Sequence, residues 1–166
     1  MDDDENIKFY NETLKRHLEF DEVVEELIKY IESDKNGRYK ITVGTDSNGS
    51  NNAHFVTAIA VIKEGNGGRY FWAKTKEFFC PTLRDRIFKE TMRSIAIVQE
   101  LRGRLKEKVG EEYFWDDKIT VHLDVGNNGE TKDFVDTVVG MVKGYGLTPI
   151  IKPFSFGASV LADRHT

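Results

Sequence analysis

Two short segments of the sequence each end in an aspartate that could take part in metal chemistry. Residues 41–46 read Ile-Thr-Val-Gly-Thr-Asp, and residues 119–124 read Ile-Thr-Val-His-Leu-Asp. Side chains alternate between the two faces of a strand, so Asp46 and Asp124 each lie at the end of one face. If the two strands are parallel neighbours, both carboxylates project from the carboxyl edge of the sheet, where open α/β sheets bind ligands.

Two carboxylates that lie close together repel each other unless a cation lies between them. A divalent metal such as Mg²⁺ meets this need, because it prefers a few carboxylates together with water and substrate phosphates. The ordinary alternative is that each aspartate caps the loop after its strand, as Asp often does. That alternative explains either residue alone, but it explains the matched pair less well.

Glu90 is a candidate to join this pair. On a helical wheel it falls within about 20° of Leu83 and Leu101, so it should point towards the sheet. A carboxylate that faces the core needs a partner. Its partner is either a ligand shared with the two aspartates or a neighbouring cation such as Arg86 or Arg93.

A fourth carboxylate, Asp163, follows a short segment of small and apolar residues near the end of the sequence. It is either a further ligand or a solvated terminal carboxylate. His165, two residues later, is a candidate proton shuttle. A zinc hydrolase or a Cys/His triad is not expected, because Cys80 is the sole cysteine and no His-x-x-x-His pattern occurs. The glycine motifs of P-loop and Rossmann proteins are also missing.

The elements that must position these residues follow from hydrophobic periodicity. We expect helices over residues 20–34, 82–105, 131–142 and 158–163, and strands over 41–46, 54–62, 69–79, 119–124 and 149–154. The glycine-rich turn 65–68 joins two strands as a hairpin, and the helix between the last two strands implies a parallel crossover. The predicted fold class is therefore α/β, with a five-stranded mixed sheet of three antiparallel and two parallel strands and helices on both faces.

These residues, in this order of elements, resemble the ribonuclease H-like superfamily. The resemblance rests on Asp46 in the first strand, Glu90 in the long helix and Asp124 at the end of the fourth strand, followed by a late Asp163. Within the superfamily, residues 20–166 are most similar to the YkuK-like family of predicted RNase H-related proteins. The matching stretches are 43–47, 67–71, 83–87 with 90–91, 122–126, and 152–153 through 162–163.

The resemblance implies a two-metal nuclease that acts on RNA, an RNA–DNA hybrid or structured DNA. Asp46 would bridge two Mg²⁺ or Mn²⁺ ions about 4 Å apart. Glu90 and Asp124 would hold one of these ions, and Asp163 would hold the other. The candidate substrate-binding residues are Lys152, Arg86, Asn48 and Ser47, with Lys152 placed to contact a phosphate.

Charge is distributed unevenly along the sequence. The 166 residues have a net charge of −4, which by itself argues against a broad nucleic-acid-binding surface. However, residues 1–36 carry −7 and residues 37–166 carry +3. Residues 68–108 carry +6, and Phe71 and Trp72 lie among them where they could stack on bases. The alternative is that these cations form an ordinary solvated helix face.

Length and composition predict one globular domain, residues 20–166, preceded by an acidic arm, residues 1–19. Tyr10, Leu14 and Leu18 have near-helical spacing in this arm, which would support a homodimer or cover the basic surface. Deletion of the arm should then strengthen nucleic-acid binding. The acidic first residues are unlike a signal peptide and no segment resembles a membrane span, so we expect a cytoplasmic protein without membrane partners.

Three functions remain to be weighed. The first is the metal-dependent nuclease, which requires the carboxylates. The second is a catalytically silent module on the same fold that binds nucleic acid or protein, and whose binding does not depend on Asp124. The third is an actin-like phosphotransferase, which is disfavoured because such enzymes need two domains to close on ATP and 166 residues provide one.

Overall fold

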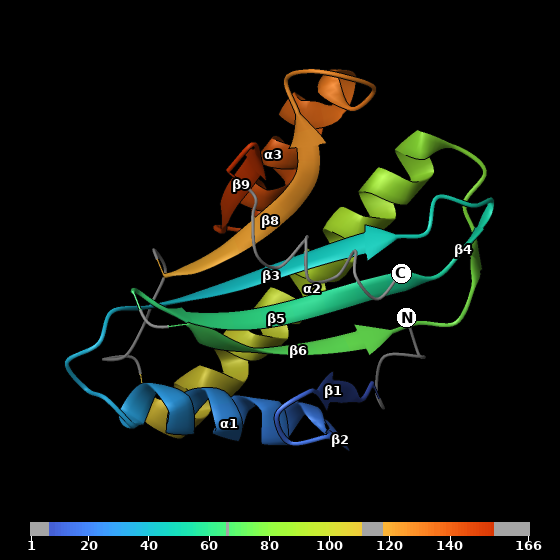
Figure 1. Ribbon diagram of the computed structural model, residues 1–166. Coiled ribbons are helices and arrows are strands. Elements are labelled where there is room, and N and C mark those ends of the chain that lie inside the picture. Colours follow the sequence, from blue (N-terminus) through green and yellow to red (C-terminus); the bar gives the residue numbers. More distant parts are fainter. Residues whose placement is uncertain (1–6, 66, 111–117, 155–166) are drawn as a thin grey trace.

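A seven-stranded mixed sheet forms the centre of the computed structural model, which describes residues 7–65, 67–110 and 118–154 (Figure 1). Its order is β2-β1-β6-β5-β3-β8-β9. The strands are β1 (Phe9–Asn11), β2 (Arg16–Leu18), β3 (Tyr39–Ser47), β5 (Phe55–Lys63), β6 (Gly68–Lys74), β8 (Ile119–Gly126) and β9 (Thr148–Lys152). A separate two-stranded sheet pairs β4 (Asn52–Ala53) with β7 (Phe78–Phe79), and the helices are α1 (Phe20–Glu32), α2 (Leu83–Val109), the 3-10 turn η2 (Lys132–Phe134) and α3 (Val135–Gly144).

The α/β class and the mixed sheet agree with the prediction, but the sheet has seven strands rather than five. The five expected strands lie in the order β6-β5-β3-β8-β9. The two additional strands, β1 and β2, form a hairpin that joins the edge of β6, where Tyr10 lies opposite Trp72. Each has only three residues, so neither is long enough to produce a recognisable alternation of apolar and polar side chains.

Residues 7–19, which the sequence analysis assigns to an acidic arm, pack with the rest of the described structure. Phe9 and Leu18 are fully buried in the main core. Tyr10 and Leu18 lie on paired strands, and Leu14 lies in the turn between them and is 40% exposed. The near-helical spacing of these residues is therefore coincidental, because the segment is a hairpin.

The α-helices within the described ranges cover one face of the sheet. α1 packs on α2, α2 lies on β3 and β8, and α3 lies on β8, β9 and α2. Apolar side chains from all three helices enter the same core. The expectation of helices on both faces is thus not met here, because two right-handed crossovers that run the same way across a sheet place their helices on the same side. The expected helix 158–163 lies outside the described residues.

Strands β3 and β8, which contain the matched Ile-Thr-Val segments, are parallel neighbours, so the condition for bringing both aspartates to one edge of the sheet is met. Thr42 pairs with Thr120, and Gly44 pairs with His122. Beyond this last pair the two strands are no longer paired, and β8 bends away from β3 (Figure 1). The carboxyl ends of the two strands therefore diverge at this edge of the sheet.

Helix α2 packs against both of these strands. It begins after Thr82, whose hydroxyl accepts a hydrogen bond from the Asp85 backbone N–H at 3.1 Å, as expected of a helix cap. Ile87, Val98 and Leu101 are buried on the face predicted to meet the sheet. None of the helices in the described ranges is long and apolar enough to cross a membrane.

Candidate functional site

Asp46 and Asp124 lie at the carboxyl ends of β3 and β8, on the face of the sheet that no described helix covers. We call this the second face. Leu123 and Val125 enter the core between the helices and the sheet, so Asp124 between them points to the second face. Asp46 lies there too, two positions after Gly44, and it is 9% exposed. The strand register therefore places both aspartates as the sequence predicts.

Glu90 reaches the same edge from α2. It points towards the sheet, as predicted, and its Oε1 accepts a hydrogen bond of 2.7 Å from the Ser47 hydroxyl at the end of β3. The pKa of Glu90 is raised to about 8, chiefly because the carboxyl group is buried. The negative charges of Asp46 and Asp124 also raise it, and the hydrogen bond from Ser47 opposes the rise. The three carboxylates thus share one electrostatic environment.

Lys152 provides a positive charge at this edge. Its Nζ lies 2.6 Å from Asp124 Oδ1, and its side chain is 54% exposed. β9 brings it there by pairing Lys152 with Gly126. A side chain at Gly126 would place its Cβ only 3.0 Å from Lys152 Cβ, so the glycine allows the two strands to approach. The residue predicted to contact a phosphate is therefore at the site, paired with one of its carboxylates.

Of the other predicted site residues, some lie near the carboxylates and others do not. Ser47 is bonded to Glu90, and Arg86 lies one helical turn before Glu90 on α2. Asn48 lies in the exposed loop after β3, where it accepts a hydrogen bond of 3.3 Å from the Ser50 hydroxyl. Asp163 and His165 lie outside the described residues.

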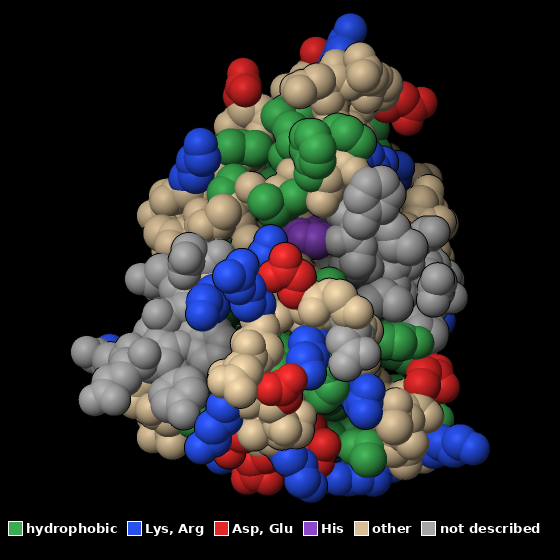
Figure 2. All heavy atoms as spheres, turned by 60° about the vertical axis from the view of Figure 1, so that its left-hand side comes forward, with side chains coloured by type: hydrophobic (Ala, Val, Ile, Leu, Met, Phe, Trp, Pro, Cys, Tyr) green, Lys and Arg blue, Asp and Glu red, His purple; other side chains and the backbone are tan. Residues whose placement is uncertain are grey.

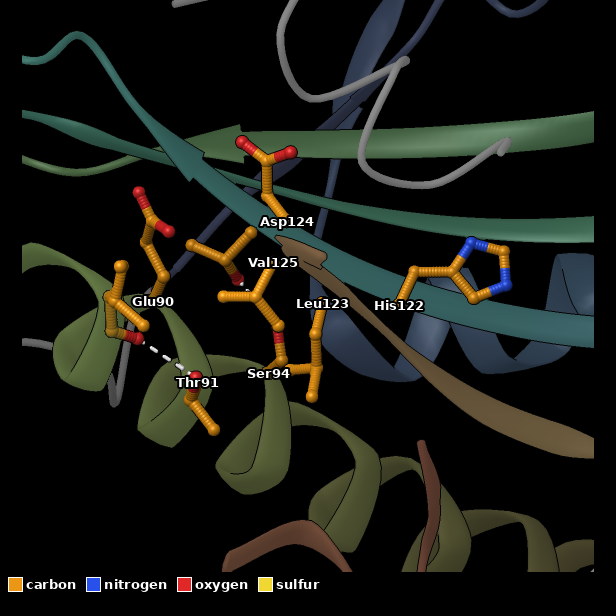
Figure 3. A pocket seen from close by; sticks show the side chains of 9 residues that line it. Glu90, Thr91, Ser94, His122, Leu123, Asp124 and Val125 are labelled. Carbon is orange, nitrogen blue, oxygen red and sulfur yellow. Dashed lines mark hydrogen bonds between the residues drawn. The ribbon is translucent and has the colours of Figure 1, made fainter. Parts of the chain in front are cut away.

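A small cavity lies behind the carboxylates, with a water-accessible volume of about 10 Å³. Glu90 and Asp124 point their carboxylates to the same side of it, whereas the ring of His122 points away from them (Figure 3). This volume holds about one water molecule, so the cavity is not a substrate pocket. Substrate must approach the carboxylates from the surface.

Sequence reasoning missed the contribution of Thr45, which joins β3 to α2 beneath the site. Its buried hydroxyl lies 2.8 Å from Ser94 Oγ and 2.9 Å from Thr57 Oγ1. The available signal was the alternation of β3, which turns Thr45 towards the helices while Asp46 turns away. This chain of buried hydroxyls fixes the helix that carries Glu90 against the strand that carries Asp46.

The donor set suits a hard divalent cation, since Asp46, Glu90 and Asp124 offer only carboxylate oxygens. Such a cation would also favour the ionised form of Glu90, whose pKa is raised by burial and, after it, by the charges of Asp46 and Asp124. Nevertheless, within residues 7–65, 67–110 and 118–154, no three acidic, histidine or cysteine side chains lie close enough together to hold one ion. The described residues therefore supply suitable ligands but not a complete coordination sphere.

The basic stretch 68–108 is largely occupied by contacts within the protein. Arg104 bonds to Asp21 of α1 at 2.7 Å and to Glu100 at 2.6 Å. Lys108 lies 3.4 Å from Glu25 of α1. Acidic side chains of α1 thus neutralise the end of α2, which explains part of the charge division seen in the sequence.

The aromatic residues of β6 are also used internally. Phe71 is 1% exposed in the main core, so the expectation that it stacks on bases is wrong. Trp72 lies on the second face, where it packs on Val56 and Ala58 and lies 5.8 Å from the ring of Tyr10. Burial therefore excludes Phe71 as a stacking residue, whereas Trp72 is partly exposed.

Comparison with known proteins gives a consistent result. Residues 22–166 match the family model described as "Ribonuclease H-like". The chain is 29% identical over 171 aligned residues to "Uncharacterized protein YkuK" of Bacillus subtilis (strain 168), and the alignment covers 95% of this chain and 96% of that protein. No solved structure matches the chain significantly.

Proposed function

Because the chain belongs to the ribonuclease H-like family, we propose that it is a metal-dependent nuclease that hydrolyses phosphodiester bonds of RNA, an RNA–DNA hybrid or structured DNA. The observation that carries this proposal is that carboxylates from three separate elements are directed to the carboxyl edge of β3 and β8. Asp46 and Asp124 come from paired parallel strands, and Glu90 comes from the helix behind them. Burial raises the pKa of Glu90, and the charges of the other two carboxylates raise it as well.

In this proposal Asp46, Glu90, Asp124 and Asp163 would hold two Mg²⁺ or Mn²⁺ ions. Such ions stabilise the attacking water and the leaving 3′ oxygen of a phosphodiester. The Ser47 hydroxyl orients the carboxylate of Glu90. The half-exposed ammonium of Lys152, which lies 2.6 Å from Asp124 Oδ1, would contact a substrate phosphate, and His165 is the proposed proton shuttle.

The test is cleavage of single-stranded RNA, an RNA–DNA hybrid and branched DNA in the presence of Mg²⁺ or Mn²⁺. We expect the Asp46→Asn variant to lose at least about 100-fold in rate, since even residues that only support metal ligands cost 10- to 100-fold. Asp136→Asn, which makes the same change on the exposed side of α3, should cleave like the unmodified protein. If the unmodified protein binds these nucleic acids but cleaves none of them with either ion, the proposal fails.

One observation favours a second candidate, a catalytically silent nucleic-acid-binding module. The ammonium of Lys152 already neutralises Asp124 at 2.6 Å, so this carboxylate is balanced without a metal ion. The module predicts binding that weakens with salt and persists in Asp124→Asn. The nuclease predicts that the same variant loses cleavage.

A further inference from the structure

A groove of about 900 Å³ lies on the second face of the sheet, towards the amino ends of β3 and β8. We call it the second-face groove. Thr42, Thr120 and His122 contribute to its floor from these two strands. Arg38, Lys40 and Lys118 line it as exposed cations. The groove is separate from the small cavity behind Glu90 and is large enough for an extended ligand.

The charge of the groove suits an anion. Three basic side chains line it, and Glu64 is the one acidic residue among the described residues that line it. Figure 2 shows this side of the molecule, where Lys and Arg side chains gather beside a histidine and apolar side chains lie on its other side. A cationic groove next to apolar surface fits a ligand that carries both phosphates and flat rings.

Two features inside the groove indicate that a ligand completes it. Thr42 is 4% exposed, and its Oγ1 has no hydrogen-bond partner in the described part of the chain. Such a buried hydroxyl costs about 1–3 kcal/mol until a partner satisfies it. Phe154 is 76% exposed at the groove, although a large aromatic ring is normally buried. It provides a surface on which a nucleobase can stack.

The groove shares its face with the carboxylates. Thr42 and Asp46 lie four residues apart on the same side of β3, which corresponds to about 13 Å. His122 and Asp124 lie two residues apart on the same side of β8. A ligand that lies along these strands therefore leads directly to the candidate site.

We propose that the second-face groove binds an unpaired nucleic-acid strand and directs it to the carboxylate edge. Arg38, Lys40 and Lys118 contact its phosphates, the Thr42 hydroxyl donates to a phosphate or base oxygen, and Phe154 stacks on a base. A single strand is favoured over a duplex because only unstacked bases present their faces to a side chain. The direction of the strand rests on the proposed nuclease function, whereas its binding in the groove does not.

The experiment measures fluorescence polarisation of a labelled 12-nucleotide single strand and of its duplex, in EDTA so that no cleavage occurs. We expect the single strand to bind more tightly. Combined reversal of Arg38→Glu, Lys40→Glu and Lys118→Glu should weaken its binding at least about 10-fold. The slope of log affinity against log salt should become shallower by about two, at about 0.7 for each of three phosphate contacts.

The matched control reverses three exposed lysines elsewhere, Lys29→Glu, Lys132→Glu and Lys143→Glu, and should bind within about twofold of the unmodified protein. Phe154→Ala should weaken single-strand binding at least about 5-fold without changing the salt slope, as expected for loss of stacking. If the triple reversal does not fold, Lys40→Glu and Phe154→Ala, each at an exposed position, serve in its place.

The inference is overturned if the groove variants bind the single strand as tightly as the unmodified protein does. It is also overturned if the groove substitutions weaken binding of the single strand and of the duplex equally. This outcome is distinguishable from failure of the nuclease proposal. A protein that binds through the groove but cleaves nothing supports the groove alone. A protein that cleaves, and whose groove variants bind normally, supports the nuclease alone.

Discussion

At the scale of single residues, the carboxylates were the most predictable part of the site. Asp46 and Asp124 follow from strand alternation, and the inward direction of Glu90 follows from its helical wheel position. The partners of these carboxylates were less predictable. Lys152 meets Asp124 through the pairing of β9 with β8, and Ser47 meets Glu90 across 43 residues of sequence. Such contacts depend on strand register and helix placement, which local patterns do not encode.

The raised pKa of Glu90 predicts a pH dependence of stability. The folded protein keeps the Glu90 proton up to about pH 8, while the unfolded chain releases it near 4.5. The folded state therefore binds more protons between these values, and the stability contributed by this group falls as pH rises through this window. Glu90→Gln removes this pH dependence. The free energy of unfolding of this variant should exceed that of the unmodified protein by little at pH 5 and by most above pH 8.

We expect the free energy of unfolding of the Glu90→Gln variant to exceed that of the unmodified protein by about 2 kcal/mol at pH 8.5. The full shift corresponds to about 5 kcal/mol at 1.36 kcal/mol per pKa unit, and partial exposure of the side chain reduces it. Urea unfolding in EDTA at pH 5 and pH 8.5 measures the difference. Glu107→Gln, at an exposed position on α2, should show no such gain, and an equal response of both variants would contradict the assignment.

At the scale of elements, the order and pairing of the five long elements of the sheet were predictable, because each carries a clear apolar pattern. The parallel pairing of β3 and β8, which the sequence analysis stated only as a condition for bringing the two aspartates to one edge, is present in the structure. The predicted strand 69–79 is divided, since β6 ends at Lys74 and β7 joins β4 in a separate sheet. Aromatic residues occur on both sides of that break, so periodicity alone did not reveal it.

Replacement of two glycines by alanine is expected to change the free energy of unfolding in opposite directions. A side chain at Gly68 would place its Cβ 2.3 Å from the backbone oxygen of Val61, within the β5–β6 hairpin. Gly68→Ala should therefore lower the free energy of unfolding by about 2 kcal/mol or more. Gly103 lies within α2 with no atom within 4 Å of that position, so Gly103→Ala should raise it by about 0.5–1 kcal/mol. Urea unfolding measures both, and a stable Gly68→Ala variant would show that the hairpin can shift.

At the scale of the whole molecule, the ribonuclease H-like family predicted from the motifs is confirmed. The charge division of the sequence has a structural counterpart in the contacts of Asp21 and Glu25 on α1 with Arg104 and Lys108 on α2. The role of the first residues was not predictable, because two three-residue strands gain their stability from the edge of β6 rather than from local sequence.

Deletion of residues 1–18 is therefore expected to unfold the protein rather than to strengthen nucleic-acid binding. It removes Phe9 and Leu18, both fully buried, and loss of each large core side chain costs about 2–5 kcal/mol. Thermal unfolding measures the effect. Deletion of residues 1–6 alone, which removes four acidic residues, leaves β1 and β2 in place and should retain the melting temperature. An equally stable 19–166 fragment would contradict this expectation.

The divergence of β3 and β8 beyond Gly44 and His122 has a mechanical consequence. Beyond that pair, β3 and β8 have no further register pairs with each other in the described residues. β3 stays paired with β5 as far as Ser47 and Phe55, and β8 pairs with β9 as far as Gly126 and Lys152. The separation of Asp46 and Asp124 is therefore set by the outer neighbours of the two strands, so a substitution in β5 or β9 can change it without altering either carboxylate.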